Sequence, residues 1–425
     1  MSLFALGKYL VWSRPDGHGG TAYYYYYDYY TWAVAALALA WLAWRLALRY
    51  GRARAARRRP RGTDYGLLKR VVRAKGELSA RYLPLGSSAN IHAVGVGVLP
   101  GGEYCIQIFG DDADEEAWAA EAAALPDSYG GFTVVPLGMS PAVMLSDEGP
   151  GPRAGSDPYH SGIRERREVI IGGISGANTN LTGQSGTIGY FCKRKSILPR
   201  RAEVLLVSNS HVMADLRKTA VDDGDLIAQP SPGEPAGGRP IGALVSFSPL
   251  KFGGDTDEPN HIDAALARLW PSHRHELVIP FIGTVKGYVP KRDVAVGEAV
   301  CKYGRTTGFT SGTLSSIYMD IRVWYDRTGQ SAFFRDQLLI EPTRPGFTKL
   351  VDKGDSGSLL TAEQYAVGLI FAGTSEAPGL QVAPANTEAA AESVPGAVKP
   401  PRIEGYGVAN PISEVLDRLR VELLI

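Results

Sequence analysis

Cysteine is scarce in this sequence, and neither sign of charge is in excess. Only three cysteines occur in 425 residues, Cys105, Cys192 and Cys301, and none belongs to a CxxC pair. Such spacing predicts neither a zinc site nor a disulfide framework, and the odd number favours a reducing compartment. The 45 basic and 44 acidic side chains give a net charge of +1, so no overall field attracts nucleic acid. We expect no metal, no organic cofactor and no nucleic-acid partner.

The length of 425 residues exceeds what one ordinary core fills, and it predicts two or three domains. Composition divides the chain into four parts. These are an N-terminal tail with a basic flank (1–62), a small α+β domain (63–146), a linker rich in proline, glycine and charge (147–167), and a β-rich domain (168–425).

An apolar stretch in the tail predicts a membrane-spanning helix. Residues 31–48 (TWAVAALALAWLAWRLAL) carry a single charge, Arg45, and are just long enough to cross a bilayer. Tyrosines precede the stretch and arginines follow it, as at the two interfaces of a membrane helix. The positive-inside rule then places everything after residue 49 in the cytoplasm. The alternative is an amphipathic or buried helix behind a low-complexity tail, which leaves the chain soluble in the cytoplasm.

The next part has the pattern of a small α+β domain. Helical spacing over 67–82 predicts a surface helix whose basic face meets the membrane or solvent. Two alternating runs, 91–99 and 104–109, flank a Pro-Gly-Gly turn and predict a β-hairpin. A helix over 113–125, with acidic residues in its first turn, and a strand over 132–137 complete a ββαβ order.

Beyond the linker, short apolar runs recur between turn signals and predict an all-β barrel or sandwich, so the fold class is mainly β. Residues 374–399, rich in Ala, Pro and Glu, predict an exposed loop, and the apolar spacing over 412–424 predicts an amphipathic helix. The strand-like runs lie at 186–191, 203–208, 262–269, 299–303, 337–340 and 366–371.

One serine lies in a setting suited to nucleophilic catalysis. Residues 353–358 read KGDSGS, so Ser356 stands between Gly354 and Gly357, with an aspartate before it. Glycines on both sides let the backbone turn sharply and present amide groups to a bound oxygen. No histidine follows His275, so the Ser, Asp, His order of an α/β-hydrolase is excluded. The alternative is a turn that merely precedes a strand.

A serine nucleophile needs a base, and the base needs an orienting group. His211 ends the apolar run EVLLVS, and Asp263 stands in HIDAALARL, where an unpaired buried carboxylate would be costly. The order His211, Asp263, Ser356 is that of chymotrypsin and not of subtilisin. Two alternatives stay open: His211 as a core histidine, and Asp263 as the cap of an Ala-rich helix. Other histidines offer weaker candidates for a base or metal ligand, namely His261, His273 and His275.

Several strings in this order resemble the bacterial and plant trypsin-like proteases related to the Narrow leaf 1 protein. They are GTIGYF, LLVSNSHVMA, HIDAALARL, YGRTTGFTSGTL, KGDSGSLL and AVGLIFAG, and the likeness covers most of 167–425. The hairpin VGVGV and the elements after it also resemble the small domain that precedes the protease in that family. The resemblance implies two six-stranded barrels, with His211, Asp263 and Ser356 as the catalytic triad.

The resemblance also implies the rest of the site. Gly354 and Ser356 would supply the oxyanion amides, and the GRTTG string at 304–308 would be a hairpin of the second barrel or a substrate-side element. The implied substrate pocket contains Leu350 at its base together with Phe371, Ala372 and Gly373. Because Leu350 is not an acid, a trypsin-like preference for Lys or Arg is not implied.

Together these observations predict a membrane-anchored serine endopeptidase that cleaves a protein or peptide substrate through an acyl-enzyme. The rival prediction is a non-catalytic or conditionally silent module on the same fold, which binds peptides or senses a signal at the membrane.

Overall fold

The computed structural model divides into two compact units, Met1–Arg57 and Arg58–Ile425. Each unit is treated separately below. The structure describes residues 11–15, 21–25, 34–36, 38–41, 64–88, 90–145, 147–148, 161–181, 183–195, 203–218, 220–221, 225–253, 258–325, 328–343, 349–374 and 401–425.

The N-terminal unit contains an antiparallel hairpin of β1 (Val11–Pro15) and β2 (Thr21–Tyr25), in which Val11 lies opposite Tyr25. Of the predicted span 31–48, residues 34–36 and 38–41 are described and are helical, and the remainder lies outside the described residues. Within the parts of the chain that the structure describes, no helix is both long and apolar enough to cross a membrane.

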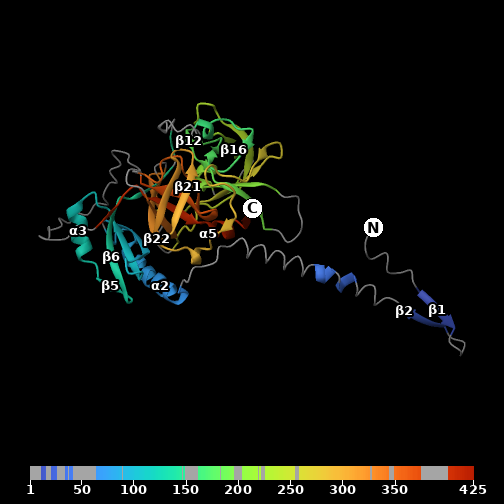
Figure 1. Cartoon of the computed structure of the whole chain (residues 1–425), viewed down its shortest axis with the longest axis horizontal. Helices are drawn as coiled ribbons and strands as arrows, with labels where there is room; N and C mark the ends of the chain where they lie inside the picture. The colour runs from blue at the N-terminus through green and yellow to red at the C-terminus, as the bar shows by residue number, and fades with distance from the viewer. Residues whose placement is uncertain are drawn as a thin grey trace. The chain divides into compact units, whose positions relative to one another are not determined.

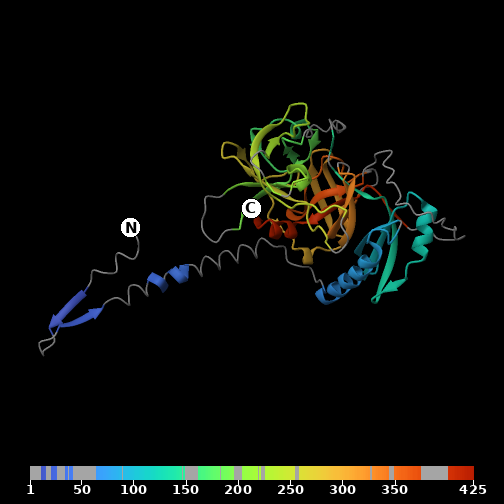
Figure 2. The same ribbon diagram turned by 180° about the vertical axis from the view of Figure 1, so that it is seen from behind.

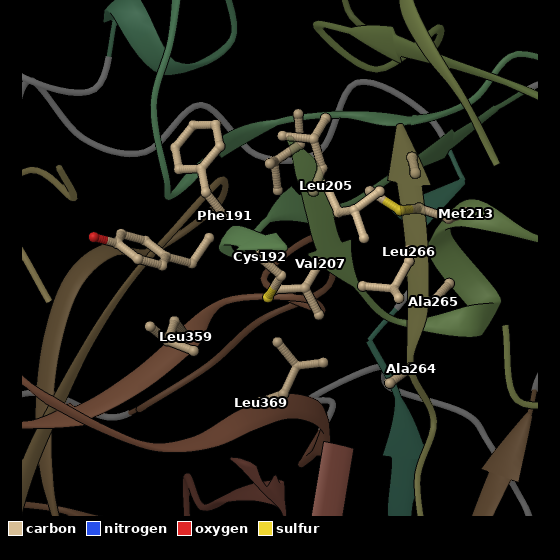
Figure 3. Close-up of a cluster of buried hydrophobic side chains, with 14 of the residues drawn as sticks. Phe191, Cys192, Leu205, Val207, Met213, Ala264, Ala265, Leu266, Leu359 and Leu369 are labelled. Carbon is tan, nitrogen blue, oxygen red and sulfur yellow. The ribbon is translucent and has the colours of Figure 1, made fainter. Parts of the chain in front are cut away.

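The larger unit contains a seven-stranded antiparallel sheet (Figure 1). Its apolar side chains face a core that includes Phe191, Leu205 and Leu266, and Figure 3 shows that Leu359 and Leu369 of the second sheet reach the same core. The central strands β14, β15 and β18 are buried at most positions, which fits their apolar sequences. In sheet order the strands are β11 (Ala177–Asn178), β16 (Leu226–Gln229), β17 (Arg239–Phe247), β18 (Ala265–Leu269), β15 (Leu205–Ser208), β14 (Tyr190–Arg194) and β28 (Val421–Leu423).

A thirteen-stranded sheet forms the rest of the unit, and part of it closes into a barrel. Six consecutive strands, from β21 to β22 in sheet order, form a ring because β21 also pairs with β22. The sheet order is β21 (Ala299–Gly304), β24 (Leu359–Ala362), β25 (Tyr365–Gly373), β27 (Gly407–Pro411), β23 (Gln330–Pro342), β22 (Gly308–Tyr325), β3 (Ile91–Val98), β4 (Tyr104–Gly110), β6 (Phe132–Met139) and β26 (Arg402–Ile403), with β5 (Ser128–Tyr129) on β6, β20 (Gly287–Tyr288) on β25, and β7 (Ala142–Met144) between β22 and β25.

Three short strand pairs complete the β structure. Part of the predicted linker 147–167 is ordered in one of them, because β8 belongs to that range. The pairs are β8 (Asp147–Glu148) with β12 (Gln184–Ser185), β9 (Val169–Ile170) with β19 (Arg274–His275), and β10 (Ile174–Ser175) with β13 (Thr187–Ile188).

The predicted ββαβ elements are confirmed, and they join the β-rich part of the unit through a shared sheet. Strands β3 and β4 form the predicted antiparallel hairpin, and β6 runs parallel to β4 after the helix α3 (Glu115–Ala123). The strand β22 is 18 residues long, and it pairs with β23 along its length and with β3. The segments predicted as 63–146 and 168–425 therefore share one sheet.

The helix predicted over 67–82 is α2 (Tyr65–Tyr82), and it begins at an Asp64 cap whose carboxylate accepts from two backbone amides. One of its basic residues faces inward. Lys75 is 2% exposed, and its Nζ lies 2.7 Å from Oδ1 of Asp320 in β22. In both views of the molecule α2 lies beside the strands β3 and β4, and its buried residues belong to the same apolar cluster as Trp118 of α3 (Figures 1 and 2). Lys75 is thus buried in an ion pair and does not contribute to the basic surface of this helix.

Most of the other sequence-based predictions of secondary structure are confirmed, with one correction. Each of the six predicted β runs contains an observed strand. The helix predicted over 412–424 is wrong in its second half, because α5 ends at Arg418 and β28 follows. Arg420 has a positive φ of 55°, which reverses the chain, and Val421 then pairs with Arg194. The predicted loop 374–399 lies, apart from Thr374, outside the described residues.

The remaining helical elements are short. They are α4 (Ser210–Met213), which carries His211, and two 3-10 turns, Ser161–Ile163 and Lys291–Asp293.

Candidate active site

The loop that carries Ser356 is shaped by two glycines with positive φ, Gly354 at 97° and Gly357 at 92°. A Cβ on Gly354 would come within 2.5 Å of Thr306 Oγ1, and one on Gly357 within 2.1 Å of Ser208 Oγ. Conformation and space therefore both demand glycine at these positions. The predicted sharp turn around the serine is present.

His211 is held at the end of a strand by its neighbours. It lies in α4, three residues after β15 ends, and it is completely buried. The hydroxyl of Ser210 fixes this turn by donating to the carbonyl of Ala264 at 2.9 Å. The imidazole is therefore placed by rigid secondary structure rather than by a long loop.

Asp263 contacts His211 directly. Nδ1 of His211 lies 2.5 Å from Oδ2 of Asp263, and the His211 amide donates to Oδ1 at 3.2 Å. A carboxylate beside Nδ1 favours the tautomer with the proton on that nitrogen, so Nε2 is left as the basic atom. Asp263 lies just before β18, which is a strand, so the reading of Asp263 as a helix cap is wrong. The carboxylate also accepts from the Tyr325 hydroxyl at 2.9 Å.

The backbone of Asp263 is fixed by two asparagines. Its amide donates to Oδ1 of Asn410 at 3.0 Å, and its carbonyl accepts from Nδ2 of Asn209 at 2.6 Å. Nδ2 of Asn410 in turn donates to Oε1 of Gln337 at 2.6 Å. Tyr325 is fully buried, and burial together with the nearby Asp263 charge raises its pKa well above the ordinary value. The phenol therefore stays protonated and remains a donor to the carboxylate.

Thr187 connects Ser356 to the strand that leads to His211. The carbonyl of Ser356 accepts from the amide of Thr187 at 2.8 Å, and the carbonyl of Thr187 accepts from the hydroxyl of Ser208 at 2.7 Å. The hydroxyl of Ser356 donates to the carbonyl of Phe371 at 3.3 Å. Ser356, His211 and Asp263 are all 0% exposed, so solvent does not reach any of the three.

A buried ion pair between Lys302 and Asp355 supports the loop 353–358, which carries the proposed nucleophile. Nζ of Lys302 lies 3.2 Å from Oδ2 of Asp355, and both side chains are 0% exposed. Asp355 also accepts from the amides of Thr306 and Thr307 at 2.8 and 3.1 Å. Both amides belong to the predicted GRTTG hairpin, which is confirmed as the turn between β21 and β22. This turn therefore also holds the loop that carries Ser356, through the hydrogen bonds to Asp355.

The charge of Lys302 keeps Asp355 ionised. Burial raises the pKa of the Asp355 carboxyl, but Lys302 and the hydrogen bonds outweigh it and bring the pKa below the ordinary value of 3.8. Burial lowers the pKa of Lys302 below its ordinary value of 10.5, and Asp355 opposes that shift.

A second buried pair connects the two sheets beside the same loop. Nε of Arg305 lies 2.6 Å from Oε1 of Glu234, and both side chains are 0% exposed. The backbone of Arg305 donates to Oγ1 of Thr187 at 3.0 Å, and that hydroxyl donates to the carbonyl of Gly354 at 2.9 Å. The position of Gly354 is thus linked, through Thr187 and Arg305, to Glu234.

The residues predicted to line the substrate pocket lie near the nucleophile loop. Leu350 precedes the loop and is fully buried, and Phe371, Ala372 and Gly373 form the end of β25. The ring of Phe371 packs on Phe334 with a centroid distance of 4.7 Å.

Four residues with roles at this site were missed by the sequence reasoning. Lys302, Tyr325, Asn410 and Glu234 are separated from the catalytic candidates by long stretches of chain, and no local spacing marks them. The one available signal was the GRTTG string, whose neighbour Lys302 is the kind of buried charge that needs a partner. Within the described residues, no group of three or more His, Cys, Asp or Glu side chains could hold a metal ion.

The fold resembles that of bacterial proteases. Solved structures give 63 matching chains. Protease A of Thermobifida fusca is 17% identical with a TM-score of 0.37, and covers 60% of this chain and 98% of its own. The chymotrypsin of Cellulomonas bogoriensis is 18% identical, with a TM-score of 0.35 and coverage of 60% and 98%. The Nocardiopsis protease is 17% identical, with a TM-score of 0.36 and coverage of 60% and 99%.

These neighbours are serine proteases of the chymotrypsin fold, and the chain is similar to them as a mainly β structure. Since all three TM-scores are below 0.5, we draw nothing on activity from the likeness. No family model and no curated protein matches the chain. The resemblance to the family related to Narrow leaf 1 therefore stays a prediction.

Proposed function

We propose that the chain is a serine endopeptidase of the chymotrypsin type, with Ser356 as nucleophile, His211 as general base and Asp263 as orienting carboxylate. The observation that supports this most strongly is the 2.5 Å contact between His211 Nδ1 and Asp263 Oδ2, with both side chains 0% exposed. A buried carboxylate that also accepts from Tyr325 is suited to stabilise an imidazolium.

The reaction would begin when the Ser356 hydroxyl leaves the Phe371 carbonyl and turns to Nε2 of His211. His211 takes the hydroxyl proton while Oγ attacks the carbonyl carbon of a substrate peptide bond. The amides of Gly354 and Ser356 stabilise the resulting oxyanion. His211 then protonates the leaving amine, the peptide C–N bond breaks, and water hydrolyses the acyl-enzyme to release the second product.

A fluorophosphonate probe tests this assignment, because it labels an activated serine hydroxyl. We expect labelling of the full chain and none of the Ser356→Ala variant. Ser272→Ala is a matched control: Ser272 is exposed, and its hydroxyl lies 3.3 Å from Nδ1 of His273. This control should label like wild type. Labelling of Ser356→Ala at the wild-type level would refute the assignment.

A conditionally silent or purely peptide-binding module is the second candidate. It is favoured by the complete burial of all three side chains and by the Ser356 hydroxyl, which donates to Phe371. If folded protein were never labelled, with or without peptides that occupy the cleft, this second candidate would be preferred.

We further propose that residues 31–48 anchor the chain in a membrane by a single pass, with the protease part in the cytoplasm. The support is the sequence pattern of an apolar stretch between tyrosines and arginines. The full chain should sediment with membranes, whereas a chain that begins at residue 49 should remain in the supernatant. Identical partitioning of the two proteins would contradict the anchor.

A further inference from the structure

A short segment of the chain pairs with the residues predicted to bind substrate. β7 is antiparallel to the end of β25, with Met144 opposite Ala372 and Val143 opposite Gly373. The amide of the next residue, Leu145, donates to the carbonyl of Phe371 at 3.5 Å. Extended peptides commonly bind a protein by adding a strand in this way. Val143, Met144 and Leu145 therefore lie beside the three consecutive pocket residues 371–373.

The carbonyl of Leu145 lies at the predicted oxyanion hole. Its oxygen accepts from the amide of Gly354 at 2.6 Å. Gly354 has a positive φ, which residues other than glycine adopt only at a cost. Glycine therefore allows the amide to take this orientation. An amide at this position stabilises the oxygen of a peptide bond under attack. Leu145 thus occupies the position of the residue whose carbonyl carbon Ser356 would attack.

The side chain of Leu145 is buried among apolar residues. It is 0% exposed and belongs to the same apolar cluster as Leu350 and Val351, the two residues just before the nucleophile loop. A Cβ on Gly373 would come within 2.5 Å of Val351, and one on Gly407 within 3.0 Å of Leu350. Glycine on the neighbouring strands thus makes the room that this apolar pair occupies. These apolar surroundings suit an aliphatic side chain.

The same segment lies next to the hydroxyl of the proposed nucleophile. The Phe371 carbonyl that accepts from the Leu145 amide also accepts from the Ser356 hydroxyl. All three members of the proposed triad are 0% exposed. The segment therefore shares a hydrogen-bond acceptor with the proposed nucleophile.

We propose that Ala142–Leu145 is a built-in substrate mimic, and that external substrates are extended peptides with leucine, or a similar aliphatic residue, before the scissile bond. This proposal rests on the proposed function. A substrate must displace the segment, which therefore competes with it. β7 also pairs in parallel with β22, with Ala142 opposite Val323 and Val143 opposite Trp324. The rival explanation is accordingly a permanent structural strand.

Peptide binding distinguishes the two explanations without requiring catalysis. In the Ser356→Ala background, we would measure the affinity of a fluorescent peptide, acetyl-Ala-Val-Met-Leu, for the full chain. Leu145→Ala should tighten binding about tenfold, because the competing segment loses its anchoring side chain. Leu137→Ala is the matched control: Leu137 is a buried leucine in β6 on the same stretch of chain, and its truncation should leave the affinity unchanged.

The same substitutions in the active chain give a second readout. Leu145→Ala should lower KM about tenfold for peptides with leucine before the cleaved bond and change kcat less than about twofold, whereas Leu137→Ala should not lower KM. Equal peptide affinity in the two variants, or equal binding of acetyl-Ala-Val-Met-Leu and acetyl-Ala-Val-Met-Asp, would overturn the proposal. If the peptide binds as expected but no variant reacts with the fluorophosphonate, the proposed catalytic function fails and the substrate mimic stands.

Discussion

Lys302 offers the sharpest test of how the nucleophile loop is held. Lys302→Met removes a charge that lies 3.2 Å from Asp355 and leaves a carboxylate that is 0% exposed. At that distance and an effective dielectric constant of about 20, two unit charges attract by about 5 kcal/mol. The desolvation of Lys302 offsets part of this, and breaking a buried pair costs about 3–5 kcal/mol in general. We expect the variant to lose about 3 kcal/mol of unfolding free energy at pH 7.

The unfolding free energy of the wild type and of Lys302→Met should change with pH in opposite directions. In the wild type, Asp355 has a pKa below 3.8, so its contribution to stability is complete above about pH 4 and is lost as the pH falls through the lowered value. Without Lys302, burial dominates and the pKa rises above 3.8. The folded variant then prefers the neutral acid, so its stability decreases as the pH rises from about 4 towards 7.

Urea denaturation between pH 4 and pH 7 measures both effects, with tryptophan fluorescence as the signal. Lys302→Met/Asp355→Asn is the control, because an amide cannot ionise and should abolish the pH slope of the single variant. A loss below about 1 kcal/mol in Lys302→Met, or the same pH slope as wild type, would show that the pair does not support this loop.

Two further substitutions test the site itself. Tyr325→Phe removes one hydrogen bond to the Asp263 carboxylate. Because such bonds to charged groups contribute about 1.5–3 kcal/mol, kcat/KM should fall about tenfold or more with little change in KM. An unchanged kcat would contradict a positioning role for Tyr325. Gly354→Ala places a Cβ within 2.5 Å of Thr306 Oγ1 at a positive φ, so fluorophosphonate labelling should fall at least tenfold, and wild-type labelling would show that the loop geometry is not required.

Much of the fold could be predicted because local signals agreed with the tertiary structure. The short apolar runs between turn signals became strands, and the acidic first turn of Glu115 and Glu116 marked α3. The end of the chain shows the limit of such reasoning. The apolar spacing that starts at Ile412 continues through the residues of β28, so a helix and a strand fit it equally well. Pairing with β14, which the sequence does not reveal, decided between them.

The candidate site was predictable for the residues with distinctive chemistry and not for those that position them. Ser356 is marked by its glycines, and His211 and Asp263 by strands and chain order. Tyr325 and Asn410 are ordinary strand residues whose roles arise only when β22 and β27 come next to Asp263. Likewise, nothing local marks Leu145, because its role depends on β7 lying beside β25.

The length of β22 makes the N-terminal part of the larger unit indispensable to the part that carries the proposed triad. Val96 and Val94 of β3 lie opposite Ile317 and Asp320 of β22, and α2 inserts Lys75 against Asp320. A shortened chain that starts at residue 168 would expose a long unpaired strand edge. It would also remove the Lys75 ammonium group from Asp320, which keeps the longer contact of 3.9 Å with Nε of Arg335. Such edges recruit other chains, so this shortened protein should aggregate rather than yield a soluble enzyme.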